Sequence, residues 1–321
     1  MTPSLQTVMS DVRAALGKPG EPIGPKHGAA PRFELFNGAN SICSQKTRAV
    51  MAHHGIPYVS HSMNMFTGQT YLPAYVRLRL IGCDRLGGPL VSEHTGSTSV
   101  AAGGCDPAVV PTLVDWHDDA VIVDSKRICL HLDLAAGSAA PLRPAHLASR
   151  IDAELDVIDN LPNYQMLTGL PPGEDRRPAS RRSGSGGAFA LSKVERCDRY
   201  MAECAGDADL VRGYAAKRAK EFDAARKLYD PEAMRTAYDN AEAACAALER
   251  KLAGHATRWM FDDAITLADL YWGIELMRMK NLGADSFWSD GRLPAVAAFA
   301  EQAEALPAIR AVVLEWPGAV F

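Results

Sequence analysis

Residues 32–57 read RFELFNGANSICSQKTRAVMAHHGIP, and the order of elements in this stretch points to the fold class. Residues 33–36 alternate as a strand does, and the Asn-Gly-Ala-Asn that follows is typical of a turn. A helix is predicted over 43–54, because Gly55 is a typical C-terminal cap and the proline two residues later cannot continue a helix. A cysteine therefore stands where a first strand meets a first helix.

The neighbouring segments extend this order. Residues 58–63 alternate as a second strand, and a long connection over 64–110 then leads to two short apolar runs. These runs, 111–114 and 120–123, predict a β-hairpin, and a helix is expected to begin at Ser125. Strand, helix, strand, hairpin and helix in this order indicate a thioredoxin-like α/β domain.

Strand patterns end near residue 140, and the rest of the chain predicts an all-α domain. The clearest helix has apolar residues at steps of three and four from Met234 to Leu252. Helical segments are expected at 145–160, 188–205, 208–229, 231–253, 266–281, 294–303 and 307–315.

We expect three parts along the chain. Residues 1–31 are rich in Gly, Pro and Ala and predict an N-terminal arm with a short helix near 5–16. Residues 32–135 form the thioredoxin-like domain, with an insertion around 64–110, and residues 141–321 form the helical domain.

The composition excludes several classes of protein. The chain has 321 residues, with 34 basic and 38 acidic side chains and a net charge of −4, which argues against nucleic-acid and membrane-surface partners. Apolar stretches are too short to cross a bilayer, and the first residues lack the pattern of a secretory signal. We therefore expect a cytoplasmic protein with no nucleic-acid or membrane partner.

The seven cysteines and nine histidines are scattered along the chain. They include no Cys-x-x-Cys pair and no cluster with zinc spacing. We expect no disulfide scaffold and no metal site, with most cysteines buried as small apolar side chains.

The strongest candidate for chemistry is Cys43. A thiol at the start of a helix is expected to have a lowered pKa, because the amide groups there carry partial positive charge. Ser41, two residues earlier, can donate a hydrogen bond to the sulfur anion. In the alternative interpretation, Ser41 only caps the helix and Cys43 packs inward.

Two further motifs follow in the predicted domain. Val110-Pro111 places a proline at the start of a strand, where a cis peptide bond makes a sharp turn and the preceding backbone can bind an extended thiol peptide. Asp124-Ser125 begins the next helix, and a hydroxyl with backbone amides there can bind a carboxylate. A trans proline at a sheet edge and a plain helix cap are the ordinary alternatives.

Together these motifs resemble the glutathione transferase superfamily, in which a thioredoxin-like domain binds glutathione and an all-helical domain binds the second substrate. Thr266 with Asp269 matches the structural capping box of its helical domain. The resemblance implies that Val110 and Pro111 hold the cysteinyl part of glutathione. It also implies that Asp124 and Ser125 hold the γ-glutamyl part.

Within the superfamily, the Ser-Ile-Cys-Ser motif with Lys46-Thr47-Arg48 is similar to the reductive dehalogenases of chlorinated hydroquinones, of the tetrachloro and 2,5-dichloro types. This resemblance implies catalysis by Cys43 and Ser41 through a glutathionyl-aromatic conjugate and a mixed disulfide of Cys43 with glutathione. Glutathione is then a co-substrate, with no metal, flavin or nicotinamide, and a small aromatic is the second substrate. Many relatives dimerise, which implies a homodimer.

Other functions remain open at this point. A glutathione-dependent thioether lyase or β-etherase, or a transferase, would use the same site on other aromatics. Glutathionyl-hydroquinone reductases have a Cys-Pro-Trp-Ala motif, whereas Cys43 is followed by Ser-Gln-Lys. A glutathione-binding scaffold without turnover would need none of the three motifs together.

Overall fold

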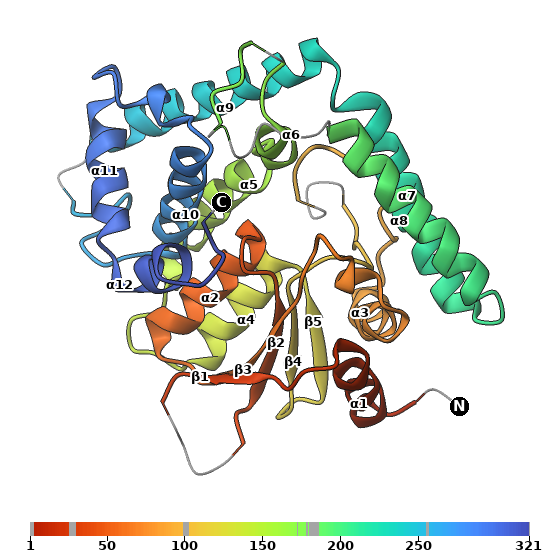
Figure 1. Ribbon diagram of the computed structural model, residues 1–321. Helices are drawn as coiled ribbons and strands as arrows, with labels where there is room; N and C mark the ends of the chain where they lie inside the picture. The colour runs from red at the N-terminus through yellow and green to blue at the C-terminus, as the bar shows by residue number, and fades with distance from the viewer. Residues whose placement is uncertain are drawn as a thin grey trace.

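The computed structural model describes residues 3–25, 30–98, 103–171, 173–177, 179, 186–254 and 257–320. Figure 1 shows a sheet at the bottom of the view, helices on both of its faces, and a helical region above. This arrangement confirms the expected fold class, a thioredoxin-like α/β domain followed by helices.

The sheet has the strand order β1-β3-β2-β4-β5. Strands β2 and β3 are parallel, with Leu35 opposite Ser60, and the other three pairs are antiparallel. Parallel neighbours need a crossover, which α2 provides between β2 and β3. The strands are β1 (Glu21–Ile23), β2 (Phe33–Asn37), β3 (Tyr58–Ser62), β4 (Thr112–Asp115) and β5 (Ala120–Val123).

Helices cover both faces of the sheet. On one face, α2 (Ile42–His54) packs against α4 (Ser125–Ala135), and on the other α1 (Leu5–Leu16) packs against α3 (Pro73–Arg85) (Figure 1). Side chains of β2 alternate between these faces, so Leu35 lies in the core with α2 and α4 while Phe36 lies in the core with α1 and α3.

The structure corrects the expected N-terminal arm of residues 1–31. Helix α1 buries Val8, Met9 and Val12 completely, and β1 pairs with β3 as an edge strand. The physical reason is an apolar stripe at helical spacing, which gains free energy only when a partner surface, here α3, covers it. Residues 1–2 and 26–29 of the expected arm lie outside the described residues.

The second half of the chain is helical, as expected. Helix α10 is its central element: all residues from Leu267 to Met279 are buried, and the predicted capping box of Thr266 and Asp269 is present. None of the described helices has the length and apolar composition needed to cross a membrane. The helices are α5 (Ala148–Asp159), α6 (Asn163–Thr168), α7 (Gly186–Glu203), α8 (Ala208–Lys227), α9 (Pro231–Leu252), α10 (Leu267–Asn281), α11 (Pro294–Glu304) and α12 (Pro307–Ile309).

The long hairpin of α7 and α8 departs from the rest of this bundle. It runs down beside α3, on the side of the sheet away from α10 (Figure 1), and α8 packs on α3. This packing brings polar residues of both helices to the connection between β3 and β4.

The structure also corrects the expectation for the cysteines. Cys83, near the end of α3, forms a disulfide with Cys105 in the connection to β4, and their Cα atoms are 5.7 Å apart. The other five cysteines are free, and three of them are buried as expected. The pairing escaped sequence reasoning because the two cysteines are 22 positions apart, and the described residues between the end of α3 and Cys105 include no helix or strand that fixes their distance.

Because α1 is packed against the sheet domain, a substitution that leaves a cavity beneath it should lower the stability of the protein. Met9→Ala should cost about 2–5 kcal/mol of unfolding free energy, because Met9 is completely buried. Urea unfolding followed by tryptophan fluorescence measures this. The matched control is Gln6→Ala on the exposed face of α1, which should change stability by about 0.5 kcal/mol or less. Equal midpoints for both variants would show that α1 contributes no packing energy.

Candidate active site

The turn before α2 presents Cys43 at the first turn of the helix. Ser41 is the N-cap, and its Oγ accepts a hydrogen bond from the amide of Ser44 at 3.3 Å. The buried guanidinium of Arg48 donates to the carbonyls of Gly38 and Ala39 at 3.0 and 2.8 Å. The turn is therefore held from both sides. Ser41 caps the helix, as the alternative interpretation expected, and it also lines the cavity beside Cys43.

The electrostatics of Cys43 differ from the expectation. Burial raises the pKa of its thiol above the ordinary value, and the negative charges of Asp159 and Asp124 act in the same direction. The charge of Lys46 and a hydrogen bond from Ser125 act against this rise. The expectation of a lowered pKa is wrong for the free protein, because the lost hydration of the thiolate outweighs the helix terminus.

Lys46 lies one turn after Cys43 and is completely buried. Its Nζ is 2.9 Å from Oε1 of Glu275 in α10 and 3.7 Å from Oδ1 of Asp159 in α5, and these two carboxylates raise the pKa of Lys46. Asn163 donates to both oxygens of Glu275 at 3.1 Å. Sequence reasoning missed this cluster, because Lys46 stands in the polar run Ser44 to Arg48, where a lysine ordinarily faces solvent.

The peptide bond between Val110 and Pro111 is cis, which confirms the sequence prediction. Two buried side chains of α3 hold this turn. Tyr75 donates to the carbonyl of Val109 at 2.7 Å, and Arg79 donates to the carbonyl of Pro111 at 2.6 Å. The backbone before Pro111 is thereby fixed at the wall of the cavity.

Asp124 and Ser125 begin α4, as predicted. Asp124 has a φ of +81°, and its Oδ1 accepts hydrogen bonds from the amides of Lys126 and Arg127 at 3.1 and 3.4 Å. Burial and the nearby Asp159 raise the pKa of Asp124 to about 6. The hydroxyl of Ser125 also reaches the sulfur of Cys43, a contact that sequence reasoning did not foresee.

All six predicted site residues line one cavity of about 270 Å³: Ser41, Cys43, Val110, Pro111, Asp124 and Ser125. The structure therefore brings together motifs that are up to 84 positions apart in the sequence (41 to 125). The cavity extends to aromatic and charged side chains of the helical region, among them Tyr164, Lys193 and Glu221. Sequence reasoning missed these residues because charged positions on a helix ordinarily face solvent.

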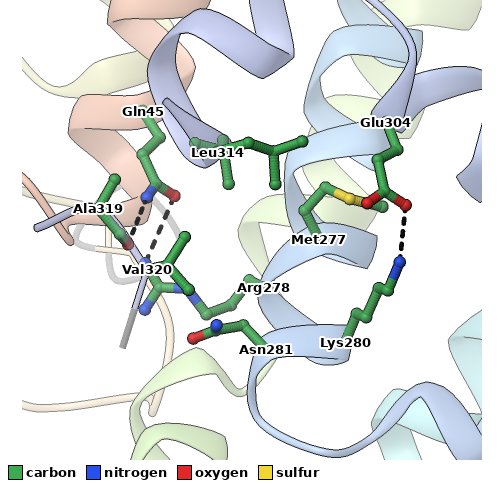
Figure 2. A pocket seen from close by; sticks show the side chains of 10 residues that line it. Gln45, Met277, Arg278, Lys280, Asn281, Glu304, Leu314, Ala319 and Val320 are labelled. Carbon is green, nitrogen blue, oxygen red and sulfur yellow. Dashed lines mark hydrogen bonds and ion pairs between the residues drawn. The ribbon is translucent and has the colours of Figure 1, made fainter. Parts of the chain in front are cut away.

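A second cavity of about 290 Å³ lies behind the start of α2 (Figure 2). Arg278 of α10 lines both cavities and donates to Oε1 of Gln45 at 3.4 Å and to the carbonyl of Asn40. Gln45 donates in turn to the carbonyl of Ala319 at 3.1 Å. The C-terminal segment and α10 thus support the turn that carries Cys43.

Comparisons with known proteins agree with this geometry. Residues 40–135 match the N-terminal domain of the glutathione S-transferase family. The chain is 37% identical over 291 residues to a 2,5-dichlorohydroquinone reductive dechlorinase of Sphingobium indicum, covering 90% of this chain and 84% of that protein. It is 27% identical over 213 residues to a tetrachloro-p-hydroquinone reductive dehalogenase of Sphingobium chlorophenolicum, covering 60% of this chain and 72% of that protein.

Solved structures show the same fold. The β-etherase LigF of Sphingobium sp. strain SYK-6 matches with a TM-score of 0.58 at 15% identity, over 88% of this chain and 99% of that one. Ure2p in complex with glutathione matches with a TM-score of 0.52 at 15% identity, over 89% and 94%. The chain is therefore a glutathione-dependent enzyme of the glutathione S-transferase family, similar to the reductive dehalogenases of that family.

Proposed function

We propose that the protein is a glutathione-dependent reductive dehalogenase of chlorinated hydroquinones. The observation that carries the proposal is the single cavity in which Cys43, the cis-proline turn and the start of α4 meet. The 37% identity to a 2,5-dichlorohydroquinone reductive dechlorinase supports the choice of substrate class. We also propose a homodimer, which is common in the family.

The residues of the cavity fit glutathione. The backbone of Val110 before the cis-proline can pair with the extended cysteinyl part, as in strand addition. The hydroxyl of Ser125 suits the γ-glutamyl carboxylate. Asp124 suits the γ-glutamyl ammonium, because its pKa is raised by burial and by Asp159, and a bound cation would relieve that cost.

The first half of the proposed reaction forms a carbon–sulfur bond. The hydroquinone tautomerises to an electrophilic ketone, the glutathione thiolate adds to the carbon that bears chlorine, and chloride leaves with the bonding electron pair. Ser41 and Ser125 offer hydroxyl donors at the place where the sulfur anion would lie. The product of this half is a glutathionyl-aromatic conjugate.

The second half uses Cys43. Its thiolate attacks the sulfur of the conjugate, so that a sulfur–sulfur bond forms and the carbon–sulfur bond breaks with its electron pair on the ring, which takes up a proton. A second glutathione then releases Cys43 by thiol–disulfide exchange. Two thiols supply the two electrons, so this scheme uses glutathione alone as reductant.

The direct test incubates purified protein with glutathione and 2,5-dichlorohydroquinone. Chloride and monochlorohydroquinone are measured while intact mass follows the protein. Chloride release with a transient adduct of one glutathione on Cys43 supports the proposal. If the same adduct forms from a glutathionyl aromatic and no chloride is released, the result would instead support the thioether-lyase alternative. A β-etherase has the same fold as this chain.

Cys43→Ser should abolish net reduction and let the glutathionyl-aromatic conjugate accumulate, because only the second half needs this thiol. Liquid chromatography with mass detection measures conjugate and product. Cys204→Ser is the matched control, since Cys204 is another free cysteine with partial exposure and does not line the cavity. Normal formation of reduced product by Cys43→Ser would rule out the mixed disulfide.

Ser41→Gly separates the chemistry of this hydroxyl from its capping role, since glycine at an N-cap costs only about a few tenths of a kcal/mol. Conjugate formation should slow by about tenfold or more if the hydroxyl donates to the glutathione sulfur anion. Ser4→Gly, at the N-cap of α1, is the matched control. An unchanged rate would leave Ser41 as a cap only.

Asp159→Asn should lower the pKa of Cys43, because the negative charge of Asp159 raises it. More thiolate is then present at a given pH below that pKa, so iodoacetamide should alkylate Cys43 several-fold faster. Mass spectrometry of the modified peptide measures the rate. Asp156→Asn changes an exposed carboxylate on the same helix and should have no effect. Equal rates in both variants would contradict this electrostatic account.

A further inference from the structure

The cavity that contains Cys43 has a second polar end, formed by residues of α6, α7 and α8 and by the connection between β3 and β4. We call it the lysine cluster; it consists of Asp106, Tyr164, Lys193, Lys217, Lys220 and Glu221, and all six line the cavity. None of these residues takes part in the proposed thiol chemistry.

Ion pairs tie the cluster together. Asp106 Oδ2 is 2.7 Å from Lys217 Nζ and 2.9 Å from Lys220 Nζ. Glu221 uses one carboxylate oxygen for Lys217 at 2.8 Å and the other for Lys193 at 3.2 Å. The side chains of Asp106 and Glu221 are exposed by 1% or less, so the cluster lies in a region of low effective dielectric.

The charges in the cluster do not balance. Three lysines face two carboxylates, which leaves an excess of one positive charge. The neighbouring groups do not cancel this charge. The buried guanidinium of Arg79, which donates to the carbonyl of Asp106, adds to it. Burial lowers the pKa of His94 and raises the pKa values of Tyr71 and Tyr164, so these groups are neutral. A buried excess charge is costly unless a counter-ion is near, so the cluster is suited to bind an anion.

Lys193 is the member that a ligand would meet. Its Nζ donates to the hydroxyl of Tyr164 and to Glu221, which among the described residues accounts for two of its three N–H groups. Tyr164 itself donates to Glu221 at 2.9 Å. Burial lowers the pKa of Lys193 to about 8, against the opposing effect of Glu221, so the ammonium is weakly compensated.

Aromatic rings surround this ammonium. Lys193 Nζ lies 4.5 Å from the ring centroid of Tyr164 and 4.4 Å from that of Phe189, and the ring of His94 is 4.3 Å from that of Tyr164. Such walls suit a flat ring more than an extended peptide. An anionic oxygen attached to an aromatic ring therefore matches both the charge and the shape of this end of the cavity.

We propose that the lysine cluster binds a phenolate oxygen of the aromatic substrate, through the ammonium of Lys193 beside the ring of Tyr164, and so restricts the substrates to rings with an ionisable hydroxyl. The inference rests on the proposed function in one respect only, that the second substrate is aromatic. It adds a binding contact and a substrate requirement, whichever bond to the ring is later broken.

The test uses 4-nitrophenol, whose phenolate form has its own visible absorption band, without glutathione. At a pH below the pKa of free nitrophenol, the wild-type protein should bind it and show the phenolate band. Lys193→Met should weaken binding by about tenfold or more and remove the band, because a charged hydrogen bond is lost. Lys193→Arg should restore both. Lys227→Met, an exposed lysine of α8, is the matched control.

Several outcomes would overturn the proposal. These are equal binding of nitrophenol by wild type and Lys193→Met, and equal affinity of the wild type for 4-nitroanisole, which cannot ionise. A third is a Lys193→Met protein that no longer binds S-methylglutathione but still binds nitrophenol, since the cluster would then bind the carboxylate of the tripeptide. Lys193→Gln, with its own thermal melting curve, serves as a second variant if Lys193→Met does not fold.

The same proteins distinguish this inference from the proposed function. If wild type binds nitrophenol through Lys193 but releases no chloride from 2,5-dichlorohydroquinone, the dehalogenase proposal fails and the phenolate site stands. If chloride is released with an unchanged KM for the hydroquinone in Lys193→Met, the dehalogenase proposal stands and the phenolate site fails.

Discussion

The buried ion pair between Lys46 and Glu275 is the interaction on which the active site depends. It joins α2, which carries Cys43, to the central helix α10 of the other region, with both side chains fully buried and 2.9 Å between the charged atoms. Removing one member of such a pair leaves an uncompensated buried charge. The position of Cys43 and the electrostatic potential at its sulfur are thus set by the interface between the two regions.

The two turns that line the cavity are built on a common principle. Each is held by a buried arginine that donates to backbone carbonyls: Arg48 to those of Gly38 and Ala39, and Arg79 to those of Asp106 and Pro111. The planar guanidinium satisfies several carbonyls at once, which fixes backbone that no helix or strand could fix. Rigid turns allow a thiol peptide and a thiol nucleophile to meet at a defined separation.

Local patterns in the sequence were enough to predict strands β2 to β5, most helices, the cis-proline, the cap at Asp124 and the position of Cys43, but not the short edge strand β1. Each of these is encoded within a few residues. The missed features are tertiary: α1 is buried only because α3 covers it, and Cys83 meets Cys105 only through an irregular connection. The raised pKa of Cys43 and the lysine cluster also depend on distant elements, so no local pattern could have shown them.

The two ends of the cavity are formed by different parts of the chain. Thiol chemistry is assigned to turns of the thioredoxin-like domain, whereas the lysine cluster belongs mainly to α7 and α8, with Asp106 as its link to the first domain. Asp106 precedes the cis-proline turn by a few residues, and its carbonyl accepts from Arg79. Asp106 therefore connects the ion pairs of the lysine cluster with the backbone of the cis-proline turn, because Arg79 donates to the carbonyls of both Asp106 and Pro111.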